Sequence, residues 1–291
     1  MCVPSRFPDT LPSAVATPRE TAEAAPGRLL PLVRAGVAVL LVLAVANGVF
    51  LYAFAASADT DYAWSIAPAA SAAFMGAGYL AGAVATALVV LAAARWRSAQ
   101  PLALPLVALS VLLLAATLIH NGKFRWGYPP TWLWTGVYAA APPAVAVAIR
   151  RQRALTTAPA ADPSLRGLRV ASLVSGVALA ACAVLLYAFP VRAGSHWPWP
   201  LTPLLARVVS AWLAMVGTAQ LWCAADLRRP SEAFIPYATL TVWSVALLAL
   251  PALHHGDLTR TGAALIVYFA AGAALLALGA YGLWRAERSE L

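Results

Sequence analysis

Long apolar runs separated by short polar segments fill the chain from residue 31 to residue 284. A helix that crosses a bilayer needs about 20 predominantly apolar residues, and each run is close to that length. The runs cover residues 31–55, 68–94, 101–119, 131–149, 168–189, 203–225, 233–252 and 262–284. The pattern therefore predicts an all-α polytopic membrane protein with about eight transmembrane helices.

The polar segments suggest how these helices are grouped. Residues 1–28 are rich in Pro, Ala and Thr and contain no apolar run, which indicates a disordered cytoplasmic tail rather than a signal peptide. A longer linker at 151–167 divides the rest of the chain. We expect one four-helix unit over 29–150 and a second over 168–286.

Composition excludes several other classes of protein. At 62% hydrophobic and 11% charged residues, the chain cannot be an ordinary soluble domain. The net charge of +9 is spread between the apolar runs, which suits membrane orientation and lipid headgroups better than nucleic acid. Cys2, Cys182 and Cys223 have no spacing that predicts a disulfide framework or a metal-ligand pair.

Lys and Arg predict the orientation, because positive segments resist translocation across the membrane. If the N-terminus is cytoplasmic, the inner segments carry fifteen of these residues and the outer loops carry four, namely Lys123, Arg125, Arg192 and Arg260. We therefore expect a protein of the cell (inner) membrane with both termini in the cytoplasm.

The two halves of the chain are similar to each other. At an offset of 135 residues, seven of the eighteen positions from Leu51 to Pro68 are identical to those from Leu186 to Pro203. With a shift in offset, the stretch from His120 matches that from His254. Because each unit has an even number of spans, both would have the same orientation in the membrane. The sequence thus predicts two parallel four-helix repeats.

Both halves carry a Trp-x-Ile/Leu-x-Pro motif just before a span, at Trp64–Pro68 and Trp199–Pro203. Proline is favoured at the first position of a helix, Thr202 can cap the second of these helices, and tryptophan favours the headgroup region. The simplest interpretation is an interfacial anchor. The outer side also gathers other aromatic residues, so the alternative is a surface that binds a lipid tail. These other aromatic residues are Trp126, Trp132, Trp134, Trp197, Tyr62 and Tyr128.

Three segments in the first half of the chain are the Tyr-Ala-Phe segment at 52–54, the Trp64–Pro68 motif and the following run from Ser71 to Tyr79. Together they resemble segments of uncharacterised multi-pass membrane proteins from actinobacteria. The resemblance covers mainly the first two spans and implies no activity and no catalytic residue.

Histidines and acids gather in the expected outer loops, where His120, His254, His255 and Asp257 are candidate ligand-binding residues. His120 and His254 hold equivalent repeat positions, so they could be brought together as ligands for a metal or haem iron. A His/Asp pair could also act as a general acid or base. The alternative is that these side chains are simply solvated at the interface.

Arg207 is the one basic residue in the outer part of an apolar run, four residues after Pro203. It can extend to the headgroups, as an anchor, or face the bundle, where a charge within the membrane is a functional candidate. Its guanidinium would suit a phosphate or carboxylate held against aromatic walls. We predict that Arg207, Trp64 and Trp199 belong to one ligand-binding region with the outer histidines.

No nucleotide-binding loop, dinucleotide fingerprint or nucleophile elbow occurs, so we expect no cofactor and no ATP-driven pump. Three classes of function remain. The first is non-enzymatic binding of a membrane lipid, or support of a partner complex, at the outer face. The second is a small transporter, suggested by the parallel repeat and by Pro142-Pro143 within the fourth span. The third is a redox or hydrolytic enzyme that acts at the outer face.

Overall fold

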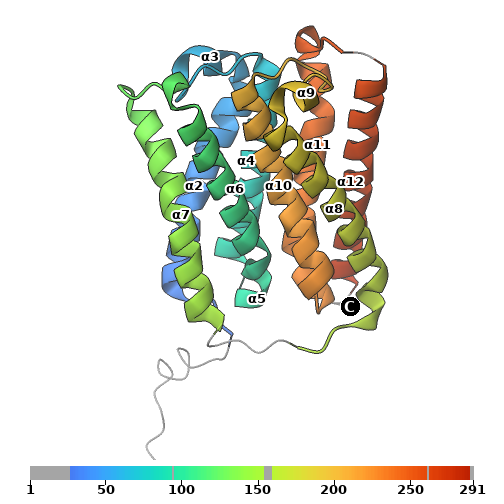
Figure 1. Ribbon diagram of the computed structural model, residues 1–291. Coiled ribbons are helices and arrows are strands. Elements are labelled where there is room, and N and C mark those ends of the chain that lie inside the picture. The colour runs from blue at the N-terminus through green and yellow to red at the C-terminus, as the bar shows by residue number, and fades with distance from the viewer. Residues whose placement is uncertain (1–26, 94, 154–158, 261, 289–291) are drawn as a thin grey trace, which may run out of the picture.

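The computed structural model of the chain describes residues 27–93, 95–153, 159–260 and 262–288. The predicted disordered tail lies, except for residues 27 and 28, outside the described residues. Eight long helices form a bundle (Figure 1). They are α2 (Pro31–Ala53), α4 (Ala69–Leu91), α6 (Ala103–Ile119), α7 (Pro129–Arg153), α8 (Arg166–Ala188), α10 (Pro203–Asp226), α11 (Phe234–Leu253) and α12 (Ala263–Glu287).

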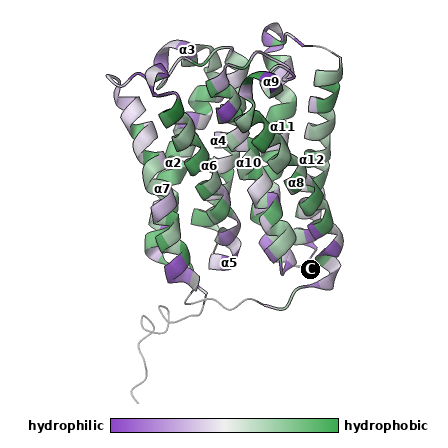
Figure 2. Cartoon of the chain, in the orientation of Figure 1, coloured by the Kyte–Doolittle hydropathy of each residue, from purple (hydrophilic) through white to green (hydrophobic). Residues whose placement is uncertain are grey.

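Eight helical segments among the described residues are long and apolar enough to cross a membrane. Hydrophobic residues line the helices along most of their length, and hydrophilic residues collect at the two ends of the bundle (Figure 2). The prediction of an all-α polytopic membrane protein is therefore confirmed.

The bundle has two ends with different contents. The loops 54–68, 120–128, 189–202 and 254–260 lie at one end, which we call the histidine end because it carries all four histidines. Two short helices, α3 (Ala58–Asp61) and α9 (Pro190–Gly194), lie there (Figure 1). The opposite end, called the terminal end, carries residues 27–30, the 159–165 linker, the 227–229 turn and the end of α12.

Four helices form the centre of the bundle and four pack around them. Helix α4 packs against α11 and α10 against α6, and α4 also contacts α10. Each central helix carries one outer helix: α2 lies on α4, α8 on α10, α7 on α6 and α12 on α11. The spans in α4, α10 and α11 are the most buried, whereas those in α2, α7, α8 and α12 bury less than a quarter of their residues inside the bundle.

Proline and a polar cap set where several helices begin. Pro31 and Pro203 occupy the first turns of α2 and α10, where no backbone amide is needed for the helical ladder. The side chain of Thr202 accepts a hydrogen bond from the amide of Leu205 at 3.2 Å, which confirms the predicted cap. Pro142 and Pro143 lie inside α7, which continues through them to Arg153.

Glycine allows the closest approach between the central helices. A Cβ added at Gly78 on α4 would overlap the indole ring of Trp212 on α10, so only glycine fits there. A Cβ at Gly82 would meet nothing within 4 Å. Gly78 thus allows α4 and α10 to approach closely, whereas Gly82 faces open space.

Hydrogen bonds also join helices from different halves of the chain. The hydroxyl of Tyr52 on α2 donates to the carbonyl of Ala246 on α11 at 2.9 Å. The hydroxyl of Tyr187 on α8 donates to the carbonyl of Leu112 on α6 at 3.1 Å. Both bonds extend from an outer helix to a central helix of the other half, so they hold the two halves together.

Candidate functional site

Arg207 lies in the second turn of α10 at the histidine end, half-buried where α10 packs between α6 and α8. Its Nη1 is 2.7 Å from Nε2 of His120, the residue that ends α6. Its guanidinium carbon is 5.8 Å from the centre of the Tyr187 ring near the end of α8. We call these three residues the Arg207 cluster.

The contact between Arg207 and His120 sets the protonation of the imidazole. Arginine stays charged and can only donate hydrogen bonds, so Nε2 of His120 must accept and the ring must be neutral. Burial, followed by the positive charges of Arg207 and Lys123, lowers the pKa of His120 below its ordinary 6.5. The cluster therefore carries one positive charge, on Arg207, at neutral pH.

No acidic side chain in the described part of the chain balances that charge. Among the residues that the structure describes, Arg207 forms no ion pair, and its Nε is buried without a hydrogen-bond partner. A buried donor without an acceptor costs free energy, and a buried charge is normally paired. The cluster is thus a half-buried cation that lacks an anion.

Apolar and aromatic side chains surround the cluster on the outside of the bundle. Leu118 and Ile119 precede His120 and are more than half exposed, as is Phe189 after Tyr187. On the other side of His120, Trp126 donates from Nε1 to the carbonyl of Asn121 at 2.9 Å. The ring of Trp126 is 5.1 Å from that of Trp132, which is 62% exposed. A ligand that contacts Arg207 would therefore lie next to an apolar, partly aromatic surface.

Trp64 and Trp199 do not contribute to that surface. Both are almost fully buried, at 1% and 0% exposure, and their rings contact other aromatic side chains of the core. Nε1 of Trp199 donates to Ser71 Oγ at 3.0 Å. The interpretation of these two residues as interfacial anchors is wrong, because protein surrounds rings that were expected to contact headgroups.

The remaining candidate residues are His254, His255 and Asp257, and they are not part of the Arg207 cluster. Asp257 Oδ2 accepts a hydrogen bond from the amide of Ala70 at 2.8 Å and so satisfies a free donor at the start of α4. His254 is half-buried and His255 exposed. Within the described ranges, no hydrogen bond, ion pair or ring contact joins these three residues to Arg207 or His120.

The arrangement of histidines and acids also bears on the metal and acid–base hypotheses. In the described part of the chain, no group of three or more His, Cys, Asp or Glu residues is placed to hold a metal ion. The partner of His120 is a cation rather than a carboxylate, so the contact does not form the His/Asp pair that general base chemistry would use.

Sequence reasoning missed an ionic network at the terminal end. Arg97 binds Glu232 with Nε and Nη2, both at 3.0 Å, and binds Asp226 with Nη1 at 3.0 Å. Glu232 is 4% exposed, and its Oε2 also accepts from the amide of Arg228 at 2.9 Å. The signal was present in the sequence, because Asp226 and Glu232 are two of the few acids near the ends of spans on the side where Arg97 is expected.

Comparison with known proteins points to no activity for this chain. No protein-family model matches the sequence, and neither a curated protein nor a solved structure matches it.

Proposed function

We propose that the protein binds an anionic lipid at the Arg207 cluster, without catalysing a reaction, and that the histidine end faces the outside of the cell membrane. The observation that carries the proposal is the guanidinium of Arg207, which has a neutral imidazole and an aromatic ring as neighbours and no described carboxylate. A phosphate or carboxylate headgroup would supply the missing charge and accept hydrogen bonds from the guanidinium.

The surroundings favour a lipid over a small soluble anion. Leu118, Ile119 and Phe189 expose apolar surface beside the cluster, at the depth where acyl chains meet headgroups. Arg207 itself lies one turn below Pro203, about 6 Å along the helix. A headgroup at Arg207 would therefore place its acyl chains along α6 and α8, which already face the bilayer.

The charge distribution supports the proposed orientation. Most of the Lys and Arg residues fall at the terminal end, and positive segments remain in the cytoplasm. Single cysteines at Asp61 and Ala160, both exposed and at opposite ends, would test it in intact cells. We expect an impermeant thiol reagent to label the Asp61→Cys variant before lysis and the Ala160→Cys variant only after lysis. Labelling in the opposite order would overturn the orientation.

We further propose that the two halves arose by duplication of a four-helix unit. The packing of α2 on α4 and of α7 on α6 corresponds to that of α8 on α10 and of α12 on α11. The hydrogen bonds of Tyr52 and Tyr187 are equivalent at an offset of 135, with acceptors at an offset of 134. Under this proposal, Arg207 corresponds to Ala72, so the anion site would exist in one half only.

The binding proposal is tested with the full chain in detergent, by native mass spectrometry with added phosphatidylglycerol or phosphatidylcholine. We expect Arg207→Met to weaken phosphatidylglycerol binding about tenfold or more, because a hydrogen bond to a charged group contributes roughly 1.5–3 kcal/mol. Arg207→Lys should retain part of the affinity. Arg192→Met removes a charge from an exposed residue at the same end and is the matched control.

Two results would contradict the proposal. One is unchanged binding of phosphatidylglycerol by Arg207→Met. The other is an equal loss in Arg192→Met, which would show that general charge at this end, rather than the cluster, attracts the lipid. A transporter is not favoured as a second candidate, because α7 continues through Pro142 and Pro143 instead of breaking into two half-helices.

A further inference from the structure

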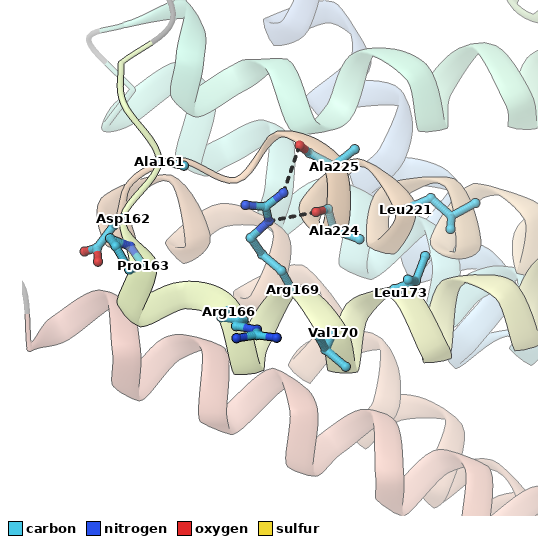
Figure 3. Close-up of a pocket in the computed structure, with 10 residues that line it drawn as sticks. All are labelled: Ala161, Asp162, Pro163, Arg166, Arg169, Val170, Leu173, Leu221, Ala224 and Ala225. Carbon is cyan, nitrogen blue, oxygen red and sulfur yellow. Dashed lines mark hydrogen bonds between the residues drawn. The ribbon is translucent and has the colours of Figure 1, made fainter.

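A shallow pocket of about 650 Å³ lies at the terminal end between α8 and α10 (Figure 3). Its lining includes Leu221 and Ala225 of α10, so the pocket lies at the opposite end of this helix from Arg207. The polar side chains in its lining are Arg166, Arg169 and Asp162, and the rest of the lining is apolar. Such a pocket combines charge at the headgroup level with walls that continue into the membrane.

Two arginines form the basic part of the pocket. Arg169 donates from Nε to the carbonyl of Ala224 at 2.8 Å and from Nη2 to that of Ala225 at 3.3 Å, so its guanidinium is held at the end of α10 (Figure 3). Its Nη1 forms no hydrogen bond with the described residues. Arg166 is exposed and forms neither a hydrogen bond nor an ion pair with any residue that the structure describes. Both side chains therefore retain donors for an anion.

The acid in the lining does not neutralise these arginines. Asp162 accepts a hydrogen bond from the amide of Ser164 at 2.8 Å, and this contact lowers the pKa of its carboxyl group. Its carboxylate is directed away from Arg166 and Arg169 (Figure 3). A third arginine, Arg285 on α12, donates to the carbonyl of Ser164 at 2.9 Å. Positive charge thus exceeds negative charge around the 161–169 segment.

The apolar part of the pocket follows α8 away from the terminal end. Val170 and Leu173 are 54% and 48% exposed, and Leu221 on α10 completes the wall. Leu173 lies seven residues after Arg166, which is about 10 Å along a helix. Val174 and Val177 extend the same exposed surface. An acyl chain would therefore run along α8 from a headgroup placed at the arginines.

We infer that this pocket binds one anionic glycerophospholipid from the leaflet at the terminal end. The phosphate would contact Arg166 and the free Nη1 of Arg169, and one acyl chain would lie against Val170, Leu173 and Leu221. The apolar walls favour a lipid over free phosphate, because free phosphate has no acyl chain that could contact them. The arginines select an anionic headgroup over a zwitterionic one. This site is independent of the Arg207 cluster and lies at the opposite end of α10.

The test counts lipids on the full chain by native mass spectrometry, with phosphatidylglycerol, phosphatidylcholine and inorganic phosphate as separate additions. We expect Arg166→Gln to weaken phosphatidylglycerol binding at one site about fivefold, the change that corresponds to one basic residue near an anionic surface. Arg150→Gln is the matched control, because Arg150 is exposed on α7 at the same end. Inorganic phosphate should not displace the lipid.

The site is then located with a photoactivatable phosphatidylglycerol. We expect crosslinks to peptides that contain residues 166–173 and 221–225, and these should persist in Arg207→Met, whose defect concerns the other site. An equal effect of Arg150→Gln, displacement by phosphate, or crosslinks confined to other helices would each overturn the inference. Loss of lipid binding in Arg207→Met alone would affect only the proposal for the histidine end.

Discussion

Two arginines lie near opposite ends of the bundle, and their surroundings differ in one respect. Arg97 at the terminal end is 12% exposed and contacts the carboxylates of Glu232 and Asp226. Arg207 at the histidine end contacts a neutral histidine and a tyrosine ring, with no described carboxylate. The first arginine is neutralised within the protein. The positive charge of Arg207 remains free to bind an anion from outside the protein.

The roles of these two arginines follow from the groups that surround them. Arginine at this depth is costly unless a partner reduces the cost. Where the chain supplies acids, as for Arg97, the group holds structural elements together. Where it supplies none, as for Arg207, the group is a candidate for binding. The residue type alone does not separate the two roles, because its neighbours decide them.

The sharpest test applies the same substitution to both arginines. Arg97→Met leaves the Glu232 carboxylate buried without its cationic partner, so we expect it to lower the free energy of unfolding by about 3–5 kcal/mol. Arg207→Met removes contacts to neutral groups but also removes a buried Nε donor that has no acceptor, so we expect a net loss of about 1 kcal/mol or less. Unfolding in mixed micelles titrated with SDS measures both. Equal losses would remove the distinction between a structural and a binding arginine.

A second pair of variants gives the scale of a packing defect without any change of charge. Gly78→Ala would drive a Cβ into the ring of Trp212 between α4 and α10, whereas Gly82→Ala adds a methyl group in open space. We expect Gly78→Ala to destabilise by about 1–3 kcal/mol and Gly82→Ala to be nearly neutral. The same SDS titration applies. A loss in Gly82→Ala as large as in Gly78→Ala would contradict the packing of these helices.

The smallest expected effect concerns pH at the histidine end. The folded protein disfavours the charged form of His120, so the unfolded chain binds this proton more readily, and stability should fall as pH drops through 6.5. Protonation also prevents Nε2 from accepting a hydrogen bond from Arg207 and adds a second positive charge. Affinity for phosphatidylglycerol should therefore rise between pH 7 and pH 5.

The control for this prediction is His120→Gln, which keeps an acceptor but does not titrate in this range. Its lipid affinity should be insensitive to pH. Its free energy of unfolding should no longer show the fall with decreasing pH that His120 causes. The ionic network of Arg97, Asp226 and Glu232 includes no histidine. We therefore expect it to contribute no change in stability between pH 7 and pH 5. An unchanged pH response in His120→Gln would place the responsible group elsewhere.

The apolar runs predicted the helices well, because each span must satisfy its backbone hydrogen bonds internally and expose apolar side chains to lipid. The burial of Trp64 and Trp199 was not predictable in the same way. Tryptophan favours both the interface and a packed core, and only tertiary contacts decide between them.

The candidate site was predicted in part. Arg207 and His120 were expected in the same outer region, but His120 was expected to pair with His254 rather than to contact Arg207. Their contact depends on α6 packing against α10, which a hydrophobic pattern does not reveal. Asp257 was expected near a ligand and instead binds the start of α4, since a carboxylate is attracted to the free amides at any nearby helix start.

Helix α10 is uninterrupted from Pro203 to Asp226, a length of about 36 Å. A regular helix resists changes in length, so a shift along its axis at Arg207 must appear at Asp226. There, Arg97 ties the helix end to Glu232, and Arg169 ties the same end to α8. These contacts therefore oppose any shift of α10 along its axis, including one at Arg207.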